Sequence, residues 1–285
     1  MRTRFTPGFV VVVALAGRVV ALAQAAPERK RGLEESLSAS ANPLGLQHVL
    51  ELRWTRSLTT SHDRFLAGAH AAAGLSHYLT PSYTRLGAWA EIAPLSVLEL
   101  RAGVEPGVYF GTFGSLLSFD SYAASFDDDR RDLRRNEARS GTGSRLYLSP
   151  TLRMQVGQFV AASSANLEWW RSSVDGPFFY EPSRDTLLAV GGDRLLALTN
   201  VVLLRRDLAG RGTFSCGVAH FLTYVFDAPR NRSQRLGVTL VRQFGPKRFG
   251  IRAPRLGGQV SYYLDHPSRK GQLNAGVGLS IRLAP

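Results

Sequence analysis

The stretch SVLELRAGVEPGVYFG, residues 96–111, alternates between two kinds of side chain. From Leu98 onward every even position is apolar, whereas the odd positions include Glu99, Arg101 and Glu105. A period of two is typical of a β-strand with one apolar and one polar face. Strands usually span about 5 or 6 residues, but a tilted strand that crosses a bilayer needs roughly 9 to 11. The stretch therefore predicts an unusually long, two-faced strand.

The same alternation recurs from residue 46 to the end of the chain, interrupted by turn-forming residues. We count eleven such runs. They cover residues 49–58, 65–79, 83–92, 96–111, 145–156, 159–170, 194–204, 213–226, 234–244, 257–264 and 271–283. Some connections between them are short, such as 93–96 and 207–212, whereas 112–143 and 172–193 are long. Aromatic residues gather near the ends of the runs.

The N-terminus has the features of a secretory signal peptide. Arg2 and Arg4 precede the apolar run FVVVVALAG, and small residues at 21–23 offer a cleavage site, so residues 1–23 are the predicted signal peptide. Residues 24–45 are polar and predict a linker or a short helix. Cys216 is the only cysteine, which excludes a disulfide within the chain.

No segment after the signal peptide is apolar enough to predict a membrane-spanning helix. A membrane location would therefore require a closed barrel, because lipid tolerates no unpaired backbone. The signal peptide, the amphipathic runs of about ten residues and the terminal run LNAGVGLSIRL resemble outer-membrane β-barrel proteins of Gram-negative bacteria. The resemblance implies an all-β fold, a transmembrane antiparallel up-and-down barrel over residues 46–285, in the cell outer membrane.

The number of strands follows from the parity of such barrels. Single-chain bacterial barrels have an even number of strands, so eleven runs predict about twelve strands, with ten as the alternative. Either a further strand lies before Gln47 or one run is miscounted.

The formal net charge of +13 comes from 35 lysines and arginines against 22 acidic residues. A basic chain can bind nucleic acid, but export argues against that partner. The expected partners are outer-membrane lipid and lipopolysaccharide, with small polar solutes, and protein partners are unknown. Ser76 and His77 are adjacent and must point to opposite faces of a strand, and the histidines lack metal-ligand spacing. We expect no catalytic residues, no metal and no cofactor.

Two groups of charged residues are candidate sites. The first would face the barrel lumen if the apolar neighbours face lipid: Glu51, Arg53, Glu99, Arg101, Glu105, Arg153, Glu168 and Arg242. The second is a charge cluster in a surface loop, which could bind Ca²⁺ or lipid phosphates or remain solvated: Asp127, Asp128, Asp129, Arg130, Arg131, Arg134 and Arg135.

Opposed acids and arginines in a lumen favour a passive channel for small hydrophilic or anionic solutes. The alternative is a structural or interaction barrel, with a plugged lumen and partner-binding loops, because small barrels fill their interior with side chains. An outer-membrane hydrolase and a secreted soluble β-sandwich are the remaining alternatives.

Overall fold

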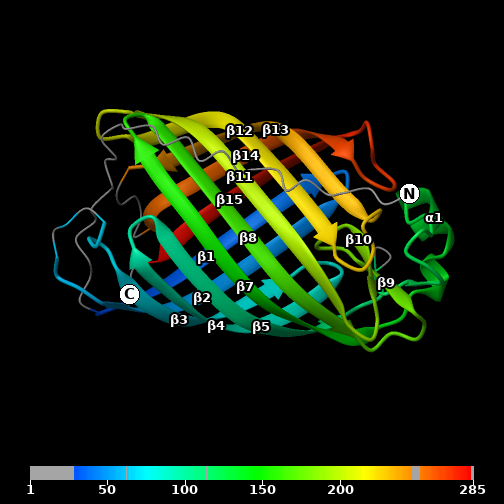
Figure 1. Cartoon of the computed structure of the whole chain (residues 1–285). Coiled ribbons are helices and arrows are strands. Elements are labelled where there is room, and N and C mark those ends of the chain that lie inside the picture. Colours follow the sequence, from blue (N-terminus) through cyan, green and yellow to red (C-terminus); the bar gives the residue numbers. More distant parts are fainter. Residues whose placement is uncertain (1–28, 62, 64, 113–114, 246–250, 284–285) are drawn as a thin grey trace, which may run out of the picture.

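Twelve long strands form a closed antiparallel barrel (Figure 1). The computed structural model describes residues 29–61, 63, 65–112, 115–245 and 251–283, so the predicted signal peptide lies outside the described residues. The barrel strands are β1 (Arg29–Ala41), β2 (Gly45–Ser57), β3 (His70–Leu79), β4 (Tyr83–Leu95), β5 (Leu98–Tyr109), β7 (Gly141–Val156), β8 (Phe159–Ser172), β11 (Asp193–Asp207), β12 (Gly212–Val225), β13 (Arg232–Phe244), β14 (Ile251–Asp265) and β15 (Leu273–Leu283).

The predicted number of twelve strands is confirmed, and the missing strand lies before Gln47. Residues 29–41, which the sequence analysis placed in a linker or short helix, form β1 instead. This strand pairs with β2 on one side and with β15 on the other, and it thereby closes the barrel. Its alternation is weak because Glu35 lies between Leu33 and Leu37 on the outward face, where it bonds His48.

The opening stretch of the sequence forms β5, and its two faces separate as the alternation predicts. Leu100, Val104 and Val108 remain 37–45% exposed, whereas Glu105 is 2% exposed. The same holds around the wall, where the exposed large side chains are mostly leucine and valine. The outer surface of the barrel is therefore an apolar belt, and the charged side chains of β5 point into the lumen.

The two ends of the barrel differ. At one end, called the loop end, two long connections carry the remaining elements: β6 (Ser118–Phe119), α1 (Asp128–Leu133) and the 3₁₀ helix η1 (Arg135–Glu137) follow β5, and β9 (Phe178–Glu181) and β10 (Thr186–Ala189) follow β8. The opposite end, called the turn end, has turns as short as residues 96–97 and holds the start of β1 and the end of β15. Among the described residues no helix is long and apolar enough to cross a membrane.

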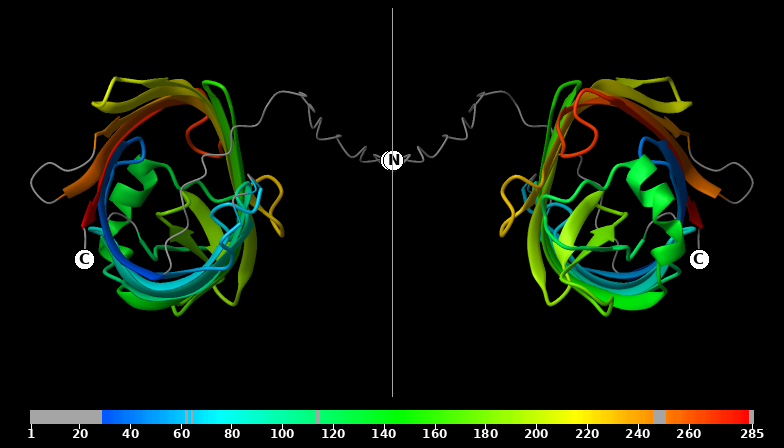
Figure 2. Two further views of the ribbon diagram at one scale, coloured as in Figure 1. Left: turned by 90° about the vertical axis from the view of Figure 1, so that its left-hand side faces the viewer. Right: turned by 90° about the vertical axis from the view of Figure 1, so that its right-hand side faces the viewer.

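Strands β10, β9 and β6 form a small separate sheet at the loop end. The end-on views show this sheet and helix α1 lying across the barrel opening (Figure 2). We call residues 115–140 and 173–192 together the plug. Its side chains pack with one another and with aromatic residues that point inward from the strands. The buried apolar residues of the two clusters are Tyr83, Tyr109, Leu116, Leu117, Phe119, Phe126, Trp170, Val174, Phe179, Tyr180, Leu187, Leu188, Leu195, Ala197, Val225 and Ala228.

Candidate functional site: the lumen

The wall of the lumen has a charged half and a small-residue half. Inward positions of β4, β5, β7 and β8 carry arginine, glutamate and large aromatic side chains. On the opposite side of the barrel, inward positions of β1, β14 and β15 are mostly glycine, serine and other small or uncharged residues. We call this second surface the small-residue wall; it comprises Ser36, Ser38, Ser40, Gly257, Gln259, Ser261, Asn274, Gly276, Gly278 and Ser280.

One ion-pair network of the charged half lies against the plug. Arg145 donates to Glu105 Oε2 at 2.8 Å and to Glu168 Oε1 at 2.5 Å. Glu168 has a fully buried side chain and also accepts from Trp170 Nε1 at 2.8 Å and from Arg184 Nε at 2.9 Å. Since Arg184 belongs to the plug, Glu168 joins the barrel wall to the plug through a charged hydrogen bond.

A second contact ties the plug to the same wall. Glu181 is completely buried in the plug and accepts from the hydroxyl of Tyr109 at 2.5 Å. Arg85, which is 4% exposed, lies 3.6 Å from Glu181 and 3.8 Å from Glu105, with its guanidinium over the ring of Tyr83. Equal numbers of arginines and glutamates meet here, so this half of the lumen has little net charge.

A further network lies on the lumen face of the neighbouring strands β2, β3, β4 and β5. Arg53 and His70 both contact Glu91, with His70 Nε2 at 3.0 Å. Arg101 donates to Glu51 at 2.5 Å and stacks 3.7 Å from the ring centroid of Trp89. These strands therefore hold their charges in pairs across the sheet.

Seven of the eight predicted lumen residues face inward, because each alternates with exposed apolar side chains or pairs with an inward residue of the next strand: Glu51, Arg53, Glu99, Arg101, Glu105, Arg153 and Glu168. The structure pairs Glu51 with Arg101 and Glu99 with Arg153 at 3.3 Å. Their partners Glu91 and Arg145 were missed as site residues, although the same alternation placed them on the polar faces of their runs.

Arg242 is the exception, and its assignment to the lumen is wrong. It lies on the same face of β13 as Leu240 and Phe244, which are exposed, and opposite the exposed Phe214 of β12. Its guanidinium bends toward the turn end, where it donates to the carbonyl oxygens of Arg211 at 2.7 Å and Thr213 at 3.3 Å. A long arginine side chain can occupy an outward position near a barrel end in this way because its head leaves the apolar belt.

The predicted surface-loop charge cluster is partly built into the plug. Asp127 caps helix α1 by accepting from the backbone N–H of Arg130 at 2.8 Å. Arg131, expected at the surface, is buried with its guanidinium 4.2 Å from the ring centroid of Tyr180. Arg134 donates to Glu137 and to the carbonyl of Ser118. Asp129, Arg130 and Arg135 remain exposed. The described residues contain no cluster of acidic, histidine or cysteine side chains that could hold a metal ion.

Arg269, in the connection between β14 and β15, joins the plug to the rim of the barrel. It donates to Asp128 Oδ2 and Oδ1 at 2.8 and 2.7 Å, to Asp185 Oδ2 at 2.7 Å and to Asn42 Oδ1 at 2.6 Å. His266 Nε2 lies 3.2 Å from Asp185 Oδ2. This cluster brings together both plug segments and the β1–β2 turn.

The ion pairs change the acidity of the plug carboxylates. Burial alone would raise the pKa of Asp185, but the hydrogen bond from His266 and the charge of Arg269 outweigh it, so the pKa lies far below its usual range. The hydrogen bond from Arg269 likewise lowers the pKa of Asp128. Both aspartates are therefore charged at neutral pH, as the Arg269 contacts require.

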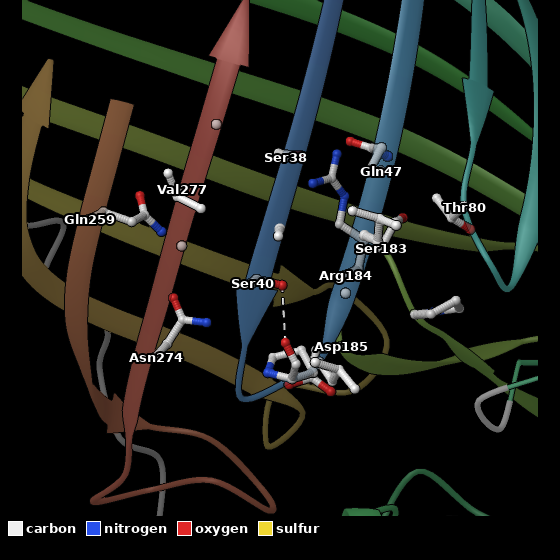
Figure 3. Close-up of a pocket in the computed structure, with 18 of the residues that line it drawn as sticks. Ser38, Ser40, Gln47, Thr80, Ser183, Arg184, Asp185, Gln259, Asn274 and Val277 are labelled. Carbon is white, nitrogen blue, oxygen red and sulfur yellow. Dashed lines mark hydrogen bonds between the residues drawn. The ribbon is translucent and has the colours of Figure 1, made fainter. Parts of the chain in front are cut away.

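A cavity of about 810 Å³ remains between the plug and the small-residue wall. Figure 3 shows Ser38, Ser40 and Gln47 on β1 and β2, and Gln259 and Asn274 on β14 and β15, around this space. The cavity reaches the rim at Pro43 and Thr80, and Arg184 and Asp185 of the plug form its other side. Its lining combines small and polar residues with a few larger apolar ones, such as Leu44, Leu46 and Tyr83.

The glycines of the small-residue wall have room for side chains. A Cβ atom at Gly278 would meet its nearest neighbour, Ser38 Cβ, at 3.6 Å, and one at Gly257 would meet the Leu240 carbonyl at 3.8 Å. Both distances are ordinary van der Waals contacts. The space in front of these glycines is therefore open, and it can be filled by substitution without displacing the backbone.

No protein-family model matches the chain, and no curated protein matches it. Among solved structures, the β domain of the Bordetella autotransporter BrkA is 14% identical, covers 91% of this chain and 100% of its own length, and has a TM-score of 0.47. The NanC porin is 11% identical over 89% of this chain and 100% of its own, with a TM-score of 0.40. OmpF of Salmonella typhi, solved with daunomycin, is 8% identical over 89% and 97%, with a TM-score of 0.30.

These similarities are too low to support an argument about function. The closed twelve-stranded wall and its apolar outer belt nevertheless define the class of the protein as a membrane-spanning β-barrel.

Proposed function

We propose that the protein is an outer-membrane barrel that conducts small hydrophilic solutes passively along the small-residue wall. The observation that carries the proposal is the cavity of about 810 Å³ beside Gly257, Gly276 and Gly278, on the side of the lumen opposite the ion pairs of Arg145. The path is eccentric, because the charged half of the wall and the plug fill the other side.

The charges along this path favour anions over cations. Arg235 faces the cavity, donates to Asn274 at 2.7 Å and has no carboxylate within ion-pair distance among the described residues. Toward the turn end, the inward residues Arg255 and Arg282 share Glu34, so that one positive charge remains in excess. Unbalanced positive charge in a narrow aqueous path attracts anions and repels cations.

Conductance in planar lipid bilayers tests the proposal. The purified full-length barrel should give discrete channels whose reversal potential in a KCl gradient shows a preference for chloride. Gly278→Trp should reduce the single-channel conductance several-fold, because the indole would fill the open side of the lumen. Leu279→Trp is the matched control, since Leu279 lies next to Gly278 on β15 but points outward with 45% exposure, and its conductance should equal that of the unmodified protein. Equal conductance of both variants would contradict the proposed path.

The packed plug supports a second candidate, a barrel whose lumen is closed and whose loops bind a partner. Phe179, Leu187 and Leu188 are completely buried at the loop end, as in the core of a soluble domain. On this proposal the complete protein is electrically silent, and deletion of residues 115–140 opens a conductance while membrane insertion is retained. Channels in the complete protein would contradict it.

A further inference from the structure

A second hollow, of about 890 Å³, lies on the outer wall of the barrel at the loop end. It crosses β3, β4, β5, β7 and β8, and we call it the outer groove. Its residues are His77, Thr84, Leu86, Pro106, Gly107, Val108, Thr142, Gly143, Ser144, Arg171, Ser172 and Ser173. None of the predicted site residues belongs to it, and the proposed conduction path does not use it.

Strand register shows which groove side chains face outward. Thr84 and Thr142 each stand opposite Val108 on β5, and Ser144 stands opposite Arg171 on β8. Since Val108 is 45% exposed on the outer surface, its cross-strand neighbours share that surface. Outward polar residues are thus grouped on a wall that is otherwise apolar.

The groove lies across the edge of the apolar belt. On its turn-end side, Leu86, Leu146 and Trp169 are 43–60% exposed, and Leu146 is paired with Trp169. An exposed tryptophan at this level is typical of the boundary between hydrocarbon and headgroups. Ser144 and Arg171 lie two residues closer to the loop end than Leu146 and Trp169, and therefore on the headgroup side.

Arg171 differs in its contacts from the arginines that are built into the plug. Arg131, Arg134 and Arg269 are held by carboxylates, carbonyls or aromatic rings of the plug. Arg171 is exposed, and its side chain has no hydrogen bond or ion pair among the described residues. A free guanidinium beside hydroxyl groups is a suitable donor set for a phosphate, which it can bind with two parallel N–H bonds.

We propose that the outer groove binds a membrane lipid with a phosphate-bearing headgroup, with Arg171 and the Ser144 hydroxyl on the phosphate and the acyl chains along Leu86 and Leu146. A lipid fits better than a soluble anion because the groove is polar only on its loop-end side and continues into the apolar belt. The inference rests on the proposed membrane location and not on conduction.

Native mass spectrometry of the detergent-solubilised barrel tests the inference. The probes are phosphatidic acid, the matching diacylglycerol without phosphate, and inorganic phosphate. We expect the barrel to retain phosphatidic acid at least fivefold more than diacylglycerol, and Arg171→Gln to abolish that difference. Arg130→Gln removes the same charge from the exposed face of helix α1 and should retain phosphatidic acid fully. Because the Arg171 side chain has no hydrogen bond or ion pair among the described residues, its replacement should not disturb folding, which heat-dependent migration in SDS gels would verify.

Two outcomes would overturn the inference. Equal retention of phosphatidic acid by Arg171→Gln and the unmodified protein would remove the groove as the site. Equal binding of inorganic phosphate and phosphatidic acid would reduce it to a simple anion site with no lipid component. Loss of conduction in the bilayer experiment, by contrast, would leave the inference intact.

Discussion

The most constrained single residue of the lumen is Glu168. Its buried carboxylate accepts hydrogen bonds from Arg145, Trp170 and Arg184. This one side chain therefore joins β8 to β7 and to the plug. Removal of one partner from a buried ion pair is costly because the other charge stays buried without compensation. Glu99 offers a contrast, since its partner Arg153 is half exposed.

We therefore predict that Glu168→Gln lowers the free energy of unfolding by roughly 3 kcal/mol. Glu99→Gln, the control with a solvent-screened pair, should lower it by less than about 1 kcal/mol. Urea titration of both variants in detergent micelles, followed by tryptophan fluorescence, measures the difference. Equal destabilisation by the two substitutions would show that the Glu168 network does not act as a unit.

At the residue scale, alternation alone predicted which way most charged side chains point. It could do so for Glu105 and Glu168 because a side-chain period of two leaves no freedom once the neighbouring leucines face lipid. The assignment of Arg242 to the lumen went against this rule, because Arg242 has the same parity as the outward Leu240. The pairing of charges, such as Arg145 with both Glu105 and Glu168, depends on strand register, which the sequence does not display.

At the scale of elements, the plug is the feature that the sequence predicted least. The segments 112–143 and 172–193 were correctly expected to be long connections, but nothing in their composition indicated that β6 would pair with β9. Nor could the sequence indicate that Arg269, Asp128 and Asp185 would meet, since Asp185 and Arg269 lie 84 positions apart. Such contacts form only after the barrel has brought the connections of its loop end together.

The Arg269 cluster makes a prediction about pH. Because the pKa values of Asp128 and Asp185 are lower in the folded protein than in the unfolded chain, their ion pairs stabilise the docked plug above about pH 4, the ordinary range of aspartate. That stabilisation is lost only as the pH falls through the lower folded values. We expect the bilayer conductance to stay constant from pH 8 to pH 5 and to increase in stronger acid, when the plug detaches.

Arg269→Gln should have the increased conductance already at neutral pH, because the substitution removes the hydrogen-bond donor from both aspartates. Arg232→Gln, which breaks the exposed pair with Asp265 at the same end of the barrel, is the control and should not change the conductance. A conductance that rises between pH 7 and pH 5 in the unmodified protein would contradict this account of the plug.

At the scale of the whole molecule, the class and strand number were predictable because long alternating runs, parity and the absence of an apolar helix all indicated one architecture. The exception was β1, whose lumen face consists of residues such as Ser36 and Ser38 and whose outward face contains Glu35. A strand with so little apolar contrast cannot be told from a linker until its two neighbours are known. These serines, which made β1 hard to recognise in the sequence, form one side of the proposed conduction path.

We predict that a chain beginning at residue 45, without β1, fails to form a compact barrel. Strands β2 and β15 would then both be left with unpaired edges, which a membrane barrel cannot tolerate. Unheated samples in SDS gels should lose the fast-migrating folded band. A chain beginning at residue 29 retains β1 and should keep that band; a folded band from the shorter chain would show that β2 and β15 can close the wall alone.

The seam between β1 and β15 also has a consequence for the order of assembly. Most neighbouring strands of the barrel follow one another in the chain and can pair as hairpins, whereas the contacts of Glu34 with Ser280 and Arg282 join residues 246 and 248 positions apart. Contacts of such separation form slowly because a long loop must first be closed. Until the last strand has been synthesised, the growing sheet has two edges with unpaired backbone groups. A chaperone or the membrane itself must keep these edges from pairing with those of another copy.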